Sequence, residues 1–149
     1  MKRAAWSERG ASLPESAVVM TVLLAMIFGV IEFGRLMYTY AFVAQIAREG
    51  ARWAIVRGNQ CSLLDHCNAA PSDIQTYVRS LNEGATNSGN IGVTASWPSA
   101  GCPPGVSGNS PGCTVVVTVT YPFYFFAVKL LGVPTQVSLS STSQMIISQ

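Results

Sequence analysis

The first side chain whose type and position suggest chemistry is Glu15, a carboxylate at the start of a long apolar run. Ser12 and Pro14 precede it, so it fits the capping box of a helix, in which its carboxylate reaches back to a free backbone N–H. A carboxylate close to lipid also costs a few kcal/mol unless it is paired, which makes it a functional-site hypothesis by default. The two roles are compatible, and we keep both open for Glu15.

The cysteines offer either disulfide or metal chemistry. Cys61 and Cys67 lie close to His66, yet a fourth ligand is missing and the spacing matches no standard zinc site. Four cysteines allow three disulfide connectivities. We favour the two local pairs, because each would staple one loop: Cys61 with Cys67, and Cys102 with Cys113.

Other classes of chemistry find little support. The chain has no Gly-rich phosphate loop, and no arrangement of serine, histidine and acid stands out. We therefore expect no enzymatic activity, no cofactor and no metal. The nine Lys and Arg residues are scattered and the net charge is only +2, so nucleic acid is not an expected partner.

The element that must position Glu15 is the apolar run from Leu13 to Ile31. About 19 residues at about 1.5 Å each span roughly 28 Å, close to the hydrocarbon core of a bilayer, about 30 Å. Lys2, Arg3 and Arg9 precede the run, so the positive-inside rule predicts a cytoplasmic N-terminus. Everything after Ile31, the cysteines included, then lies outside, where disulfides persist.

Strong helix formers continue beyond the apolar run, without a proline between Glu15 and Arg57. We predict one helix over residues 11–57 that is embedded in the membrane to about residue 31. Its external half must pack against another element. Two faces of that half differ in chemistry: Tyr40, Ala44, Ala47, Ala51 and Ala54 gather on one side, and Gln45, Arg48, Glu49 and Arg52 on another. We expect the first of these, the alanine face, to let another element approach closely.

Residues 58–149 predict an extracytoplasmic α+β domain. A short amphipathic helix follows residue 70, with Ser72 as N-cap and Gly84 as C-cap. Alternating apolar residues then predict strands near residues 91–97, 115–121 and 137–147, and residues 122–134 read as an apolar connection. The expected fold is a long transmembrane helix that continues into a small external domain, with a short helix and an antiparallel sheet of about three strands.

Two motifs in the long helix carry a resemblance to a known family. The stretch "IEFGRLMYTYAFVAQIAREGARWAI" contains EFGR and then AREGAR. Before it, a short basic leader ends in glycine and is followed by a glutamate at the fifth position of the remaining chain, as in type IV prepilins. The chain resembles the TadE-like proteins of tight-adherence (Tad, or Flp) pilus systems from Arg9 almost to Gln149, with the downstream "VVVTVTYPF" and the final strand also similar.

The resemblance implies a processing site and an assembly residue. In type IV prepilins a membrane aspartic peptidase cuts after the glycine, which here lies between Gly10 and Ala11 and ends a leader of residues 1–10. The new α-amino group is cationic, and Glu15 of a neighbouring subunit would neutralise it during assembly. Such a pair is stronger in a low-dielectric setting than in water.

The resemblance also places five residues at the charged positions of the family: Glu32, Arg35, Arg48, Glu49 and Arg52. The alternative is plainer. Glu32 and Arg35, spaced i,i+3, would anchor the helix at the membrane surface, and the other three would form a solvated face.

Small residues recur every four positions inside the membrane run and predict a partner helix, because such a stripe lets transmembrane helices approach closely. Compositional accident is the alternative, since alanine and glycine are common in membrane helices. The stripe consists of Ala17, Thr21, Ala25 and Gly29.

These observations lead to a non-enzymatic, pilin-like protein as the first expectation. It would be a minor pseudopilin of the bacterial inner membrane that acts by helix packing, with prepilin peptidase, other pilin-like subunits and pilus assembly proteins as partners. The alternative is an uncleaved single-pass membrane protein whose external domain binds or stabilises a partner of the secretion machinery. Release by ordinary signal peptidase is disfavoured, because Glu32 and Arg35 follow the apolar run instead of a small-residue cleavage site.

Overall fold

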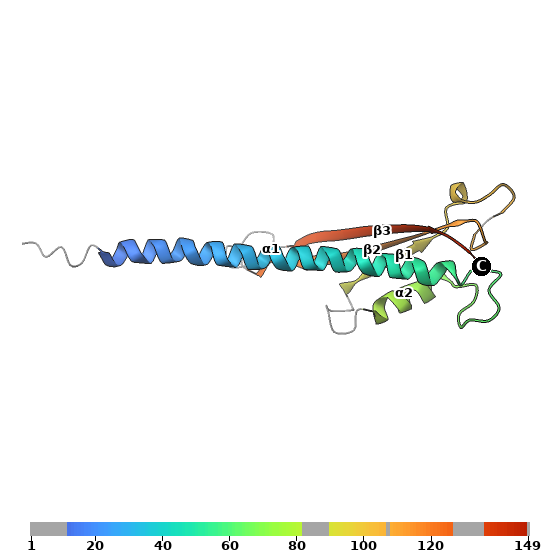
Figure 1. Ribbon diagram of the computed structural model, residues 1–149, viewed down its shortest axis with the longest axis horizontal. Helices are drawn as coiled ribbons and strands as arrows, with labels where there is room; N and C mark the ends of the chain where they lie inside the picture. The colour runs from blue at the N-terminus through green and yellow to red at the C-terminus, as the bar shows by residue number, and fades with distance from the viewer. Residues whose placement is uncertain (1–11, 82–89, 107, 127–135, 149) are drawn as a thin grey trace, which may run out of the picture.

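The computed structural model describes residues 12–81, 90–106, 108–126 and 136–148. Its dominant element is α1 (Ser12–Ile55), a continuous helix of 44 residues. The first half of α1 extends away from the other elements, and the second half lies along them (Figure 1). The structure therefore confirms one long N-terminal helix and gives it slightly shorter bounds than the predicted 11–57.

An antiparallel sheet of three strands accompanies the second half of α1. The strands are β1 (Gly92–Ser96), β2 (Thr114–Tyr124) and β3 (Gln136–Ile146), in the order β1-β2-β3. Val117 at the centre of β2 is paired with Ala95 and with Ser143. A single turn of 3-10 helix, η3 (Ser99–Gly101), follows β1. The predicted α+β fold with a three-stranded sheet is confirmed.

The end of β2 corrects one prediction. Residues 122–124 belong to the strand, whereas we predicted that the apolar connection begins at Pro122. The pairing of β1 with β2 ends at Thr120, so beyond that point β2 has β3 as its single strand neighbour. Proline is tolerated at such an edge, because the ladder needs no N–H on the open side.

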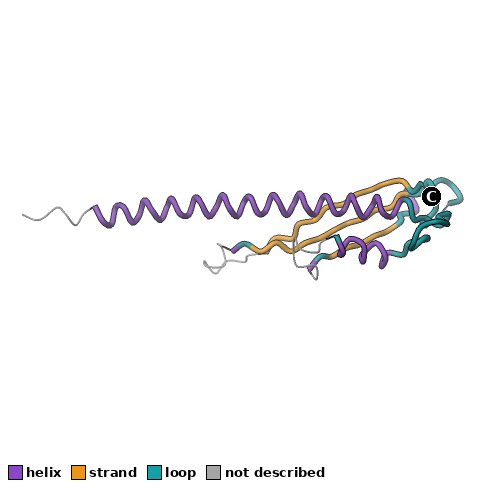
Figure 2. The backbone as a smooth tube through the Cα atoms, turned by 60° about the horizontal axis from the view of Figure 1, so that its bottom comes forward, coloured by secondary structure: helices purple, strands orange, loops and turns teal. Residues whose placement is uncertain are grey.

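Both helices of the domain cover the same face of the sheet, and the core lies between the helices and that face. The short helix α2 (Pro71–Ser80) packs against α1 and β1, and α1 packs against β2 and β3 (Figure 2). The alternation predicted for this strand is confirmed: Val115, Val117 and Val119 point inward and are fully buried, and Tyr121 on the same face is half-buried. The opposite face of the sheet is polar, with Thr94, Thr118 and Thr142 in register across the three strands.

Small side chains on α1 let the helix approach the sheet closely. Ala47, Ala51 and Ala54 are buried, as the alanine face predicted. Tyr40 is a correction, because its side chain is 52% exposed. The buried face runs instead through Thr39, and Tyr40 is turned about 100° from it.

The N-terminus of α2 is also different from the prediction. Ala70, rather than Ser72, is the N-cap, and Pro71 occupies the first helical turn. The carboxylate of Asp73 accepts a hydrogen bond from the Ala70 N–H at 2.9 Å, which is the returning half of a capping box. Pro71 suits the first turn because its fixed φ is helical and it has no N–H to leave unpaired. The predicted C-cap, Gly84, lies outside the described residues.

The close packing of α1 can be tested at Gly50, where the helix backbone lies very near side chains of α2 and β2. A Cβ at this position would lie 2.6 Å from Val78 Cγ2 and 3.4 Å from Val117 Cγ1. We expect Gly50→Ala to lower the free energy of unfolding, since overpacking a core costs about 1 to 3 kcal/mol and alanine returns at most about 1 kcal/mol of helix propensity. Thermal unfolding in detergent, followed by near-UV circular dichroism, measures the change.

Gly34→Ala is the matched control. A Cβ at Gly34 meets nothing within 4 Å, so the same substitution should leave stability unchanged or raise it by up to about 1 kcal/mol. Equal effects of the two substitutions would contradict the packing described for Gly50.

Candidate functional site

The first half of α1 is an apolar surface that the rest of the described chain does not cover. Every residue from Pro14 to Ile31 is exposed, and the segment is long and apolar enough to cross a membrane. The predicted stripe of small residues lies on this surface. At Gly29 a Cβ would meet nothing within 4 Å, and the Thr21 hydroxyl donates to the Ala17 carbonyl at 2.8 Å, which satisfies its polar group within the helix.

Glu15 lies in the first turn of this helix and is exposed. A negative charge is favoured there by the helix dipole. Gly10 and Ala11, which form the predicted processing site, lie outside the described residues, as does the Ser12 side chain that would complete the capping box. Both roles of Glu15 therefore stay predictions.

Glu32 and Arg35 form a junction between α1 and the end of the sheet. The Glu32 carboxylate accepts a hydrogen bond from the Phe126 backbone N–H at 2.7 Å and another from Arg35 Nη1 at 3.1 Å. The Arg35 guanidinium lies 5.5 Å from the centroid of the Phe123 ring. Glu32 is only 9% exposed, so it is a buried tether within the chain. Its predicted role as an anchor at the membrane surface stays a prediction.

The spacing of residues along α1 carries a signal for this junction. Glu32, Val43 and Ala54 follow one another at intervals of 11 residues, which is close to three helical turns. All three are buried on the face of α1 that meets the sheet. The spacing of Glu32 therefore indicated a partner within the chain. That the partner is the backbone of Phe126 required the fold.

The other charged positions of α1 lie on a face that is open to solvent. Arg48 and Arg52 are exposed, and with Gln45 and Glu49 they line a shallow hollow of about 430 Å³. Arg48 Nε donates to the Ala44 carbonyl at 3.1 Å. We call Gln45, Arg48, Glu49 and Arg52 the charged stripe. Its exposure leaves it accessible to another protein.

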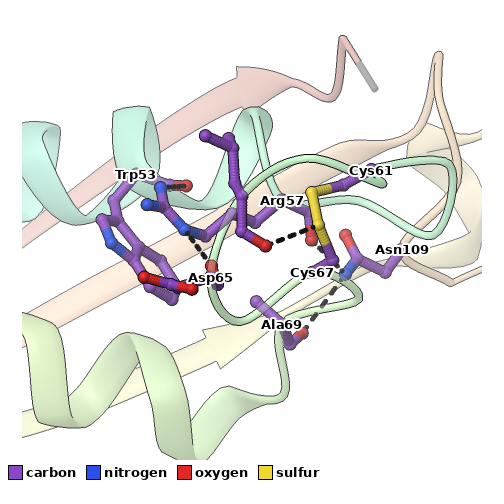
Figure 3. Close-up of a disulfide and its surroundings, with 8 residues drawn as sticks. Trp53, Arg57, Cys61, Asp65, Cys67, Ala69 and Asn109 are labelled. Atoms are coloured by element: carbon purple, nitrogen blue, oxygen red, sulfur yellow. Dashed lines mark hydrogen bonds between the residues drawn. A yellow bond between two sulfur atoms is a disulfide. The ribbon is translucent and has the colours of Figure 1, made fainter.

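The end of the domain farthest from the N-terminus is held together by Arg57 and Asn109. Arg57 lies 4.2 Å from the centroid of the Trp53 ring, and its Nε donates to the Asp65 carbonyl at 2.9 Å (Figure 3). The Asn109 amide donates to the carbonyls of Arg57 and Ala69, at 3.2 Å each. These contacts fasten two loops, residues 56–70 and 102–113, to the end of α1.

Disulfides staple the same two loops. Cys61 is bonded to Cys67 and Cys102 to Cys113, as the local pairing predicted. Bonded sulfurs are not available as thiolates, so the trio of Cys61, His66 and Cys67 cannot act as a zinc site in this state. Among the described residues no group of three or more His, Cys, Asp or Glu side chains could hold a metal ion.

A second hollow, of about 270 Å³, lies between α2 and the end of α1. Trp53 and Tyr77 stack in it at 5.1 Å between ring centroids, and His66 Nδ1 lies 3.9 Å from the Asp73 carboxylate. Because the two rings are packed against each other, the hollow is explained by the packing of α2 on the end of α1.

Comparison with known proteins addresses the long helix directly. Residues 10–52 match the family model described as TadE-like protein. The long helix is similar to that of TadE-like proteins. Comparison with curated proteins and with solved structures gives no match.

The match confirms the resemblance over the part of the chain where both motifs lie. It ends at Arg52, so similarity of the strands to the family stays a prediction. The TadE-like helix suits a membrane anchor, since it is apolar, near the N-terminus and uncovered over its first half.

The Glu32 junction makes a prediction that hydrogen exchange can test. We expect Glu32→Ala to speed exchange of the Phe126 amide by roughly tenfold or more, because a hydrogen bond to a charged group contributes about 1.5 to 3 kcal/mol and its loss leaves the N–H open to exchange. Amide exchange in detergent, measured by NMR, gives the rate. Glu49→Ala, a carboxylate removed from the charged stripe, should leave that rate unchanged. An unchanged rate in Glu32→Ala would show that the junction does not form.

The disulfide pairing can be read directly from tryptic peptides. Cys61 and Cys67 fall in the peptide 58–79, and Cys102 and Cys113 fall in the peptide 80–129, because Arg57, Arg79 and Lys129 bound them. Without reduction, each peptide should appear by itself with the mass of one internal disulfide. Covalent linkage of the two peptides to each other would contradict the pairing, since both other connectivities require it.

Proposed function

We propose that the protein is a minor pseudopilin of a tight-adherence pilus, of the type IVc-like class, and that it acts in pilus assembly through helix packing. The observation that carries this proposal is the TadE-like match over α1, together with the uncovered apolar surface of its first half. An apolar helix surface of this length needs lipid or other helices around it. The proposed site of action is the bacterial inner membrane, with the N-terminus in the cytoplasm and the domain outside.

The proposed mechanism begins with removal of the leader after Gly10 by prepilin peptidase. The α-amino group of Ala11 is then cationic, and Glu15 of a neighbouring pilin-like subunit pairs with it. In lipid either charge alone is unfavourable, so their pairing favours a defined axial register between subunits.

Packing between helices supplies the remaining attraction. Lipid tails are as apolar as leucine, so association within a membrane depends on close van der Waals contact at small residues. The proposed contact uses the stripe of Ala17, Thr21, Ala25 and Gly29, on which no described segment of the chain lies.

The external domain has a structural role in this proposal, without catalytic activity and without a cofactor. Because α1 is continuous from the membrane run to the core, force or displacement at one end reaches the other. The charged stripe lies on the exposed side of this rod and is the proposed contact with pilus assembly proteins. A domain of this size exceeds the very short major pilins of such systems, which favours a minor subunit.

Processing is tested by intact mass and N-terminal sequencing of the membrane-extracted protein, from cells with and without their prepilin peptidase. The expected chain begins at Ala11 when the peptidase is present and at Met1 when it is absent. Gly10→Leu places a bulky side chain at the cleavage site, so this variant should begin at Met1 even when the peptidase is present. A chain that begins at Met1 in both would reject processing and favour the alternative, an uncleaved single-pass protein that binds the secretion machinery.

Glu15 is tested separately from processing. We expect Glu15→Gln to be cleaved normally, yet to be recovered with other pilin-like subunits roughly tenfold less, which corresponds to about 1.4 kcal/mol. Chemical crosslinking in membranes followed by affinity purification measures this recovery. Glu15→Asp keeps the charge and should retain most of it. Full recovery in Glu15→Gln would show that the carboxylate charge plays no part in assembly.

A further inference from the structure

The end of β2 nearest the apolar half of α1, together with the residues just after it, carries aromatic side chains that the described part of the domain leaves exposed. Phe126 is 77% exposed and Tyr124 is 52% exposed. Their neighbour Phe123 is buried, and its ring meets that of Phe125 edge-to-face at 5.1 Å between centroids. We call Tyr124 and Phe126 the aromatic tip. The aromatic tip adjoins the packed rings of Phe123 and Phe125, but its own rings are exposed. Large exposed apolar surface is unfavourable in water.

The Glu32 junction fixes the level of this tip along α1. The Phe126 backbone is held 2.7 Å from the Glu32 carboxylate, so the tip lies beside helix position 32. Ser12 and Glu32 are separated by about 20 residues, or about 30 Å along a helix axis, which equals the thickness of a hydrocarbon core. A bilayer that surrounds the uncovered part of α1 therefore ends where the aromatic tip lies.

The side chains at this level have the chemistry of a membrane surface. Tyrosine, which combines an apolar body with a polar hydroxyl, is favoured at the headgroup level, and an exposed phenylalanine ring is favoured there because it leaves water. On α1 itself, Phe33 and Tyr38 are 61% and 64% exposed near the same level. The Arg35 side chain is 53% exposed, so its guanidinium can reach lipid phosphates while it is paired with Glu32.

We propose that the aromatic tip is a second membrane contact, in which the side chains of Tyr124 and Phe126 enter the headgroup region of the bilayer from which α1 emerges. Glu32 is the positioning residue, because its hydrogen bond sets the depth of the tip. The inference rests on the proposed membrane anchoring by α1.

The second contact has a consequence for assembly. The domain is fixed to α1, so the whole rod tilts as one body, and interfacial anchors are what fix the tilt of a transmembrane helix. The aromatic tip lies to one side of α1, on the side of the sheet, so its contact with lipid selects the side toward which the rod tilts. The charged stripe, on a face of α1 that is open to solvent, is then held at a defined angle to the membrane.

Depth-dependent quenching by brominated phospholipids tests the proposal. The full chain is placed in phosphatidylcholine nanodiscs, one chain per disc, so that a second copy cannot cover the tip. We expect at least half of the emission added by Phe126→Trp to be lost when the lipid is brominated near the headgroup, with a smaller loss when it is brominated near the chain end. The native residues Trp6, Trp53 and Trp97 are present in every variant, and their signal is subtracted using the unsubstituted protein.

Two further substitutions separate the possible failures. Leu63→Trp probes an exposed side chain in the loop at the far end of the domain and should be quenched by neither lipid. Val22→Trp, in the middle of the uncovered part of α1, should be quenched most by bromine near the chain end. Quenching of Val22→Trp without quenching of Phe126→Trp overturns the inference and leaves the membrane anchor intact. Absence of quenching in both overturns the anchor and the inference together.

The role of Glu32 is tested in the same discs. Adding Glu32→Ala to Phe126→Trp should remove most of the quenching, because the tip is no longer held at the membrane surface. Glu49→Ala, added in the same way, should have no effect. Quenching that is unchanged by Glu32→Ala would overturn Glu32 as the positioning residue.

Discussion

The close packing of one face of α1 against β2 and β3 is the contact on which the other features depend. From Glu32 to Ile55 the helix rises about 35 Å. Strands β2 and β3 have 11 residues each and extend about the same distance. Both ends of the contact are fastened by hydrogen bonds. The Phe126 N–H reaches Glu32 at one end, and the Ser148 N–H reaches the Ile55 carbonyl at the other, at 3.0 Å. A helix and a hairpin of equal length therefore share a fixed register.

That register requires small residues on the helix. Ala47, Gly50 and Ala51 bring the backbone of α1 close to the valines of β2, while Val43 and Ile46 fill the space nearer the membrane. A domain with one sheet and helices on one face has a thin core, and small cores need additional constraint. The two disulfides and the Arg57 and Asn109 contacts provide it at the end where the chain has the longest loops.

A single helix serves two environments in this protein, which explains its change of character near residue 32. Its first half is apolar on every side, as suits lipid or neighbouring helices, and its second half is apolar on one side, as suits a sheet. Glu32 lies at the boundary between the two halves, where it is buried against the end of the sheet. The molecule is thus a rod with a domain fixed along half its length, a shape compatible with the proposed role in a tight-adherence pilus.

The sequence by itself determined the elements whose signals are local. The length of the apolar run, the absence of proline before Arg57 and the alternation of valine in β2 specify helix and strand through neighbours a few residues apart. The motifs EFGR and AREGAR also sufficed to indicate the TadE-like helix. The disulfide pairs followed from loop lengths, since residues six and eleven positions apart close short loops.

The tertiary structure decided the features that join distant segments. Glu32 and Phe126 are 94 positions apart, and no local pattern relates a carboxylate on a helix to the backbone of a residue after a strand. Tyr40 was misplaced because a helical wheel groups residues without knowing which face the sheet will cover. Pro122 joined β2 because β1 is short and leaves that edge open, which depends on strand order. Local chemistry set what each segment could become, and the packing of α1 on the sheet selected which of its charged side chains turned inward.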